Sequence, residues 1–110
     1  MKKALVLGGS GTMGYAITKE LCERGIHVVA FARNKQKLES LFQEERDVTI
    51  VAGDVFEKNN LLTAAKGVDI IFHAVNIPYA EWEKKQRNLL TNILEVTKYY
   101  DVKLGIVDNI

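Results

Sequence analysis

The stretch that decides the fold of this chain is Val6-Leu7-Gly8-Gly9-Ser10-Gly11-Thr12-Met13-Gly14-Tyr15-Ala16. An apolar run over residues 4–7 leads directly into a turn with four glycines, and a helical pattern follows without a linker. This order points the free backbone N–H groups of a helix N-terminus over the end of a strand. Because such a terminus carries unpaired donors and a partial positive charge, the stretch predicts a site for a phosphate or pyrophosphate.

The glycines of this turn fit two spacings. Gly9-x-Gly11-x-x-Gly14 matches the dinucleotide-binding fingerprint, and Gly8-x-x-Gly11-x-x-Gly14 gives a second register. In either register one glycine makes the tight turn, one admits the pyrophosphate, and the last allows close packing of helix on strand. The alternative is a tight strand-to-helix turn that binds nothing. We expect cofactor contacts from Gly8, Ser10, Gly11, Thr12, Met13 and Gly14.

The rest of the chain alternates between strand and helix patterns. Apolar runs predict strands over residues 3–7, 28–32, 48–52, 68–74 and 103–107, and helical spacing predicts helices over 11–24, 35–45, 57–66 and 80–100. Gly25 and Asn34 suit a helix C-cap and an N-cap, respectively. The pattern predicts an α/β fold, a doubly wound three-layer sandwich on a parallel five-stranded Rossmann sheet of order 3-2-1-4-5. Residues 1–110 would form one domain, with its ligand at the carboxyl ends of the strands.

Composition narrows the class of protein. The chain is 47% hydrophobic and 26% charged with a net charge of +1, which favours neither a nucleic-acid nor a membrane partner. No apolar run approaches the roughly 20 residues of a membrane helix. The single cysteine, Cys22, excludes an internal disulfide and fits a cytoplasmic protein. Its place on the inward side of the first helix predicts a structural thiol rather than a reactive one.

The end of the second strand bears on the choice between NAD and NADP. An acid that binds the adenosine ribose is usual there in NAD-binding folds, but the chain has Ala32-Arg33-Asn34. The Arg33 guanidinium suits a 2′-phosphate, with Lys35 or Lys37 in support, so we favour NADP over NAD. The alternative for Arg33 is a solvated charge at a strand end.

Two further strand ends complete the expected site. Asp54 can accept a hydrogen bond from the adenine amino group while the backbone of Val55 holds the ring, or else Asp54 caps the helix that follows. Small residues after the fourth strand, Ala74 and Val75, with Asn76, would pass close to the nicotinamide ribose.

Other polar and aromatic residues near the fourth strand do not indicate a specific function. We expect His73 to be a packed strand residue. Tyr79 and Trp82 line a substrate cleft or pack on the long helix. The sequence shows no metal-ligand spacing.

With those residues in place, the chain resembles the N-terminal, nucleotide-binding half of an extended or atypical short-chain dehydrogenase/reductase, the group of NAD-dependent epimerases and dehydratases. The resemblance covers essentially all 110 residues. It rests on the glycine turn, residues 32–34, Gly53-Asp54-Val55 and residues 73–82, with residues 104–110 similar to the fifth strand that leads to that family's active site. It implies a parent oxidoreductase, or a sugar-nucleotide epimerase or dehydratase, that uses a nicotinamide cofactor.

The chain departs from the family's catalytic pattern. The family has a Ser or Thr after the fifth strand and a later Tyr-x-x-x-Lys, whereas this chain has Asp108-Asn109 and ends soon afterwards. Tyr99 and Lys103 match the second spacing, but they flank a helix end that leads into the fifth strand. We therefore expect no catalytic residue here. The chain is expected to be a piece of a longer protein, inactive alone, whose exposed fifth strand and long helix self-associate as a homo-oligomer.

Three functions remain open from the sequence. The favoured one is the cofactor domain of an oxidoreductase or epimerase whose catalytic residues lie outside this chain. The second is a non-catalytic NADP(H)-sensing module that regulates a partner. The third, a domain for another phosphate ligand such as a flavin, fits Arg33 and Asp54 less well.

Overall fold

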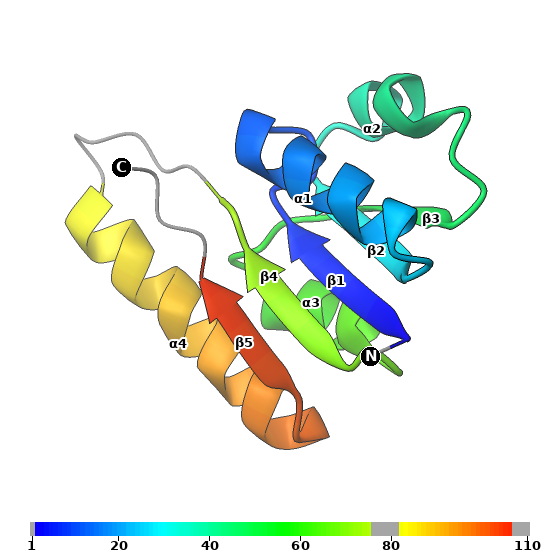
Figure 1. Cartoon of the computed structure of the whole chain (residues 1–110). Coiled ribbons are helices and arrows are strands. Elements are labelled where there is room, and N and C mark those ends of the chain that lie inside the picture. Colours follow the sequence, from blue (N-terminus) through cyan, green and yellow to red (C-terminus); the bar gives the residue numbers. More distant parts are fainter. Residues whose placement is uncertain (1, 76–81, 107–110) are drawn as a thin grey trace.

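The computed structural model describes residues 2–75 and 82–106, in which strands and helices alternate (Figure 1). The elements follow in the order β1 (Lys3–Leu7), α1 (Thr12–Glu23), β2 (His27–Ala32), α2 (Lys35–Phe42), β3 (Val48–Ala52), α3 (Lys58–Ala65), β4 (Ile70–His73), α4 (Trp82–Tyr100) and β5 (Lys103–Ile106).

The described strands form one parallel sheet of order β3-β2-β1-β4-β5. Chain order reverses at β1, which pairs with β2 on one side and with β4 on the other. The predicted α/β class and strand order are therefore confirmed. Because all these strands run in the same direction, their carboxyl ends lie at one edge of the sheet.

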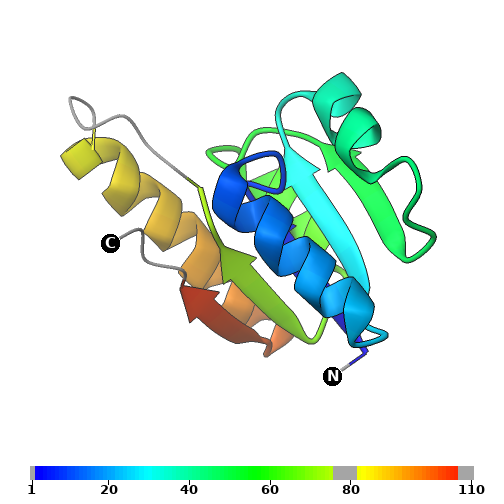
Figure 2. The same cartoon turned by 45° about the horizontal axis from the view of Figure 1, so that its top comes forward.

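Helices cover the sheet from both sides. One buried cluster joins Leu5, Phe31 and Ile71 of the sheet to Leu61 of α3 and Ile93 of α4. On the opposite face, α1 packs over β1 and β2, and α2 packs over β2 and β3. Figure 2 shows α1 lying across its face of the sheet. The central strands are therefore buried on both sides, which explains their almost continuous apolar character.

Helix ends follow the predicted capping residues. At the end of α1, Gly25 has φ 75°, its N–H donates to Cys22 O, and the Ile26 N–H donates to Leu21 O. These two bonds make a Schellman cap, and the left-handed conformation suits glycine. At the start of α2, Asn34 Oδ1 accepts from the Lys37 N–H at 3.0 Å.

α2 and β4 are shorter than the sequence predicts by several residues, whereas α1 and α3 each lose a single residue at either end. α2 ends at Phe42 rather than near residue 45, because residues 43–47 offer no apolar side chain that a further turn would bury. β4 covers Ile70–His73 rather than residues 68–74. The Val68 N–H closes a turn onto Ala65 O, so the ladder starts later.

The amino edge of the sheet is joined by Asp69. Its Oδ2 accepts from the N–H groups of Lys2 and Lys3, at 2.8 and 3.0 Å, and so links the starts of β4 and β1. These backbone hydrogen bonds hold the pKa of the Asp69 carboxyl below its ordinary value.

Phe31 connects the core to the carboxyl edge. Its ring is fully buried, and its carbonyl oxygen accepts from the N–H groups of both Gly8 and Gly9, at 2.9 and 3.0 Å. A Cβ on Gly53 would lie 2.8 Å from the ring, so β2, the glycine turn and the end of β3 all meet at this residue.

We expect Phe31→Ala to lower the free energy of unfolding by about 3–5 kcal/mol, because it opens a cavity in a dry, close-packed core. Urea denaturation followed by circular dichroism measures the loss. The control is Tyr99→Ala on α4, where the aromatic side chain is 74% exposed and about 0.5–1 kcal/mol is expected. Equal losses in the two variants would contradict the assigned core.

Candidate functional site

A cavity of about 460 Å³ opens at the carboxyl edge of the sheet. This volume is within the usual range for small-molecule sites. Its walls come from the ends of four strands and from α2 and α4. The lining residues are Gly8, Ser10, Gly11, Ala32, Arg33, Asn34, Lys37, Gly53, Asp54, Val55, Phe56, Ala74, Val75 and Lys85.

The glycine turn requires its glycines for different reasons. Gly8 has φ 83°, and a Cβ there would lie 2.6 Å from Ala74 O. A Cβ on Gly14 would lie 2.0 Å from Gly8 O, so α1 approaches the end of β1 too closely for any side chain. A Cβ on Gly11 would meet only Gly8 O, at 3.5 Å. The closest contacts are therefore at Gly8 and Gly14, a Cβ on Gly9 would lie 3.2 Å from Ala30 Cβ, and the surface at Gly11 is open to a ligand.

The other predicted residues of the turn divide into two groups. Ser10 lines the cavity, while Thr12 and Met13 begin α1 as exposed residues that the cavity lining does not include. Gly11 at the N-cap has no side chain with which to bind the amides of the first turn. The backbone of this turn, rather than its side chains, is therefore the surface offered to a ligand.

Positive charge lies at the end of β2. Arg33 and Lys37 are exposed and line the cavity together with Asn34, whereas Lys35 is exposed but absent from the lining. Of the two lysines considered as support for Arg33, the structure therefore brings Lys37 to the site.

Asp54 is held in a turn at the end of β3. Its Oδ1 accepts from the Phe56 N–H at 2.9 Å, and its own N–H donates to Asn60 Oδ1 of α3 at 3.0 Å. The N-cap of α3 is Glu57, so the alternative role of Asp54 as that cap is not what the structure shows. A carboxylate has about four acceptor positions, so the turn leaves capacity for a ligand. Val55 is 8% exposed and still lines the cavity.

The end of β4 contributes Ala74 and Val75 to the lining. Their predicted neighbour Asn76 lies outside the described residues, as do Tyr79 and the side chain of Trp82. His73 is 4% exposed, and its Nδ1 accepts from the Val75 N–H at 3.3 Å. Burial lowers the pKa of the His73 imidazole, as desolvation disfavours its charged form. His73 is thus the packed strand residue that the sequence indicated.

Some lining residues were not among the predicted contacts: Ala32, Asn34 and Gly53 appeared only as motif neighbours or caps, and Phe56 and Lys85 did not appear at all. Phe56 is 37% exposed at the end of β3, and Lys85 reaches the cavity from the first turns of α4. The available signal was weak: Lys85, Asn88 and Asn92 recur at helical spacing and form a polar stripe on an otherwise amphipathic helix.

Other candidate groups lie away from the cavity or form no site. Lys103 begins β5 at the amino edge, so the Tyr99-x-x-x-Lys103 match is at the opposite end of the sheet from the cavity. Cys22 is half-buried rather than fully buried, and burial raises the pKa of its thiol. Across residues 2–75 and 82–106, no three His, Cys, Asp or Glu side chains gather as metal ligands. None of the helices described is long and apolar enough to cross a bilayer.

Comparison with known proteins gives consistent matches. Residues 8–107 match the protein family described as NAD(P)H-binding. Photosystem II assembly factor Ycf39 of Synechocystis sp. is 30% identical over 91 residues, which are 76% of this chain and 27% of that protein. A 2-alkyl-3-oxoalkanoate reductase of Shewanella oneidensis is 38% identical over 74 residues, 66% of this chain and 18% of that protein. The chain therefore spans about a fifth to a quarter of the length of these relatives.

A solved structure has the same fold. It is a wide-type short-chain dehydrogenase/reductase from Veillonella parvula in complex with NADP. The two structures superpose with a TM-score of 0.78 at 15% sequence identity. The superposition covers 97% of this chain and 47% of the Veillonella parvula chain.

We expect Gly14→Ala to destabilise the fold by about 2–3 kcal/mol, even though alanine raises helix propensity by about 1 kcal/mol, because its Cβ meets the Gly8 carbonyl. Residue 11 has an extended backbone, and a Cβ there would lie at an ordinary contact distance. Gly11→Ala should therefore change the free energy of unfolding by less than about 1 kcal/mol. Thermal and urea unfolding of both variants test the two roles. A stable Gly14→Ala variant would contradict the close approach of α1 to β1.

Proposed function

The chain belongs to the NAD(P)H-binding family, and on that premise we propose that the cavity at the carboxyl edge binds a nicotinamide dinucleotide, with NADP(H) preferred. The diphosphate would lie against the turn of Gly8, Ser10, Gly11 and the first residues of α1, Thr12, Met13 and Gly14. The N-terminal amides of α1 would bind its negative charge. The nicotinamide ribose would pass Ala74, Val75 and Asn76.

The preference for NADP rests on the charges at the adenosine end. Arg33, which follows β2, and Lys37, in the first turn of α2, both line the cavity, and the one acidic residue of the lining, Asp54, follows β3. A guanidinium can make two charge-assisted hydrogen bonds to a phosphate, so Arg33 would bind the 2′-phosphate while Lys37 adds charge. Asp54 and Val55 would hold the adenine ring. This pairing of Arg33 and Lys37 carries the proposal.

When bound, the cofactor would supply a hydride at its nicotinamide ring. This chain's own residues would bind and orient the dinucleotide. We propose that the Tyr and Lys of the parent protein's chemistry lie elsewhere, and that the parent is a short-chain dehydrogenase/reductase-like oxidoreductase or sugar-nucleotide epimerase or dehydratase. The reductase relative supports a carbonyl substrate. A cytoplasmic location is part of the proposal, because the half-buried Cys22 is a free thiol.

A second candidate is a non-catalytic module that senses NADP(H) and regulates a partner. The similarity to a photosystem II assembly factor, a protein named for assembly rather than for a reaction, favours it. Oxidation of NADPH with a series of carbonyl compounds, by the longest protein that the gene encodes, separates the two candidates. Turnover supports the enzyme, and tight binding without turnover supports the sensor.

We expect calorimetric titration to show tighter binding of NADPH than of NADH. Arg33→Ala should weaken NADPH binding by about tenfold to a hundredfold and leave NADH binding nearly unchanged, because only NADPH has the 2′-phosphate. Lys35→Ala is the matched control, since Lys35 is a neighbouring exposed cation outside the lining. Tighter NADH binding that is indifferent to Arg33→Ala would reject the preference, and no heat with either cofactor would reject the site.

We also propose that copies of the chain associate through β5 and α4. β5 is an edge strand of the sheet, Ile106 is 62% exposed and Leu94 of α4 is 49% exposed. Open strand edges and apolar patches favour association. Light scattering should show a mass that rises with concentration, and Leu94→Glu should reduce it. A monomeric mass at millimolar concentration would exclude the association.

A further inference from the structure

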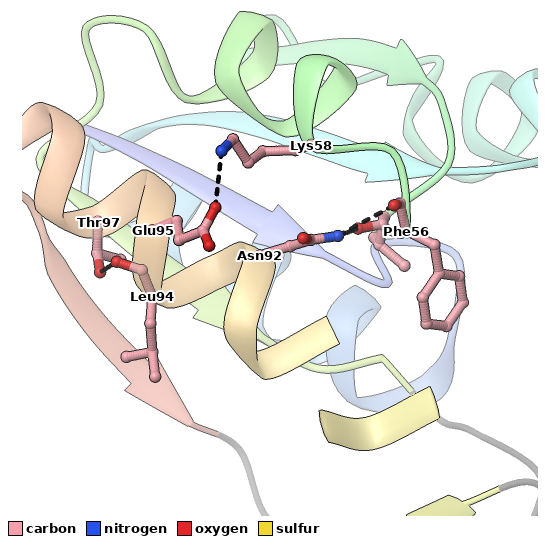
Figure 3. Close-up of polar contacts among 7 residues, drawn as sticks. Phe56, Lys58, Asn92, Leu94, Glu95 and Thr97 are labelled. Atoms are coloured by element: carbon pink, nitrogen blue, oxygen red, sulfur yellow. Dashed lines mark hydrogen bonds and ion pairs between the residues drawn. The ribbon is translucent and has the colours of Figure 1, made fainter. Parts of the chain in front are cut away.

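The turn at the end of β3 is held by side chains from two helices. From α3, Asn60 Oδ1 accepts from the Asp54 N–H at 3.0 Å. From α4, Asn92 Nδ2 donates to Phe56 O at 3.0 Å and, more weakly, to Val55 O at 3.4 Å. Figure 3 shows the Asn92 amide pointing from α4 at these carbonyl groups. This turn forms one wall of the cavity, whereas Asn92 itself is not among the lining residues.

The two hydrogen bonds of Asn92 fall on consecutive peptide units: the bond to Phe56 O holds the peptide after Phe56, and the longer one, to Val55 O, acts on the peptide unit that orients Asp54. Val55 O and the Phe56 N–H belong to the same planar peptide, so a bond to one end fixes the direction of the other. That N–H donates to Asp54 Oδ1 at 2.9 Å. Asn92 is therefore connected to the Asp54 carboxylate through one rigid peptide unit. If the amide of Asn92 is removed, this peptide can rotate and the carboxylate loses its fixed direction.

We propose that Asn92 is a positioning residue for the adenine end of the cofactor, acting through the turn of Asp54, Val55 and Phe56. The proposal rests on the proposed dinucleotide site. It also assigns the exposed face of Phe56, which lines the cavity beside this turn, as a surface for the adenine ring, because aromatic faces stack on bases. α4 thus contributes to cofactor recognition from outside the contact surface.

A neighbouring contact between the same helices provides a control. Lys58 of α3 and Glu95 of α4 form an exposed ion pair with Nζ and Oε2 2.7 Å apart, one helical turn from Asn92 (Figure 3). This pair joins α3 to α4 without touching the carbonyl groups of the turn. Breaking either the ion pair or the Asn92 hydrogen bonds would loosen the packing of α4 on α3. Only a change of Asn92 would also release the carbonyl groups of the turn.

The experiment compares Asn92→Asp, Asn92→Ala and the control Glu95→Gln by calorimetric titration. The probes are NADPH, adenosine 2′,5′-bisphosphate, which has the adenine half, and reduced nicotinamide mononucleotide, which lacks it. Both Asn92 variants should weaken NADPH and the adenosine fragment by about five- to tenfold, the loss of one hydrogen bond. Binding of the nicotinamide fragment should not change. Glu95→Gln should leave the affinity for every probe unchanged.

Each outcome is decisive. Unchanged affinity of the Asn92 variants for the adenosine fragment overturns the proposal, and so does an equal loss for both fragments, which indicates a purely structural role. Absence of NADPH binding by the unchanged protein removes the proposed function itself. If neither variant folds, hydrogen exchange of the unchanged protein replaces the test. Adenosine 2′,5′-bisphosphate must then slow exchange at the Phe56 amide, and no slowing overturns the proposal.

Discussion

The close approach of α1 to the end of β1 is the constraint on which the cavity depends. Gly14 lies so near the Gly8 carbonyl that its missing Cβ is what allows the helix to start where it does. The chain turns through the positive φ of Gly8, and α1 then begins at Thr12, next to the cavity that Gly8, Ser10 and Gly11 line. A larger side chain at either position would move the helix terminus, and with it the backbone surface that the glycine turn presents to the cavity.

The parallel sheet then brings separate segments to this terminus. Arg33, Asp54 and Ala74 follow β2, β3 and β4, and each reaches the same cavity because those strands end at one edge. The contacts at the amino edge of the sheet are structural. There, Asp69 joins the starts of β1 and β4, and the only candidate catalytic spacing in the described residues, Tyr99 with Lys103, lies on that side. The common direction of the strands therefore places the cavity at one edge of the sheet and these structural contacts at the other.

Sequence patterns predicted most of the fold because the interior requires them. β3 has the bounds that its apolar run indicates, and Gly25 and Asn34 cap the helices as expected. The resemblance to nicotinamide-dependent oxidoreductases is confirmed by the NAD(P)H-binding family match together with the reductase relative. Helix length was less predictable, since the end of α2 depends on whether residues 43–47 have anything to bury.

Residues that follow strand ends could be foreseen at the site, but contacts between elements could not. Phe56 could be assigned to the cavity only once the geometry of the turn at Asp54 was known. Lys85 and Asn92 could be assigned only once α4 was seen to pass a turn that is far away in sequence. Periodicity places such residues on a helix face without saying what that face meets.

Phe31 limits how the protein can be redesigned. Its ring occupies the interior, its carbonyl holds the glycine turn, and its edge lies where a Cβ on Gly53 would be. Repacking the interior for heat tolerance would therefore disturb ligand affinity if it included this position. The solvent-facing side of α2, where Gln36 and Glu39 are exposed, offers a safer region for such engineering.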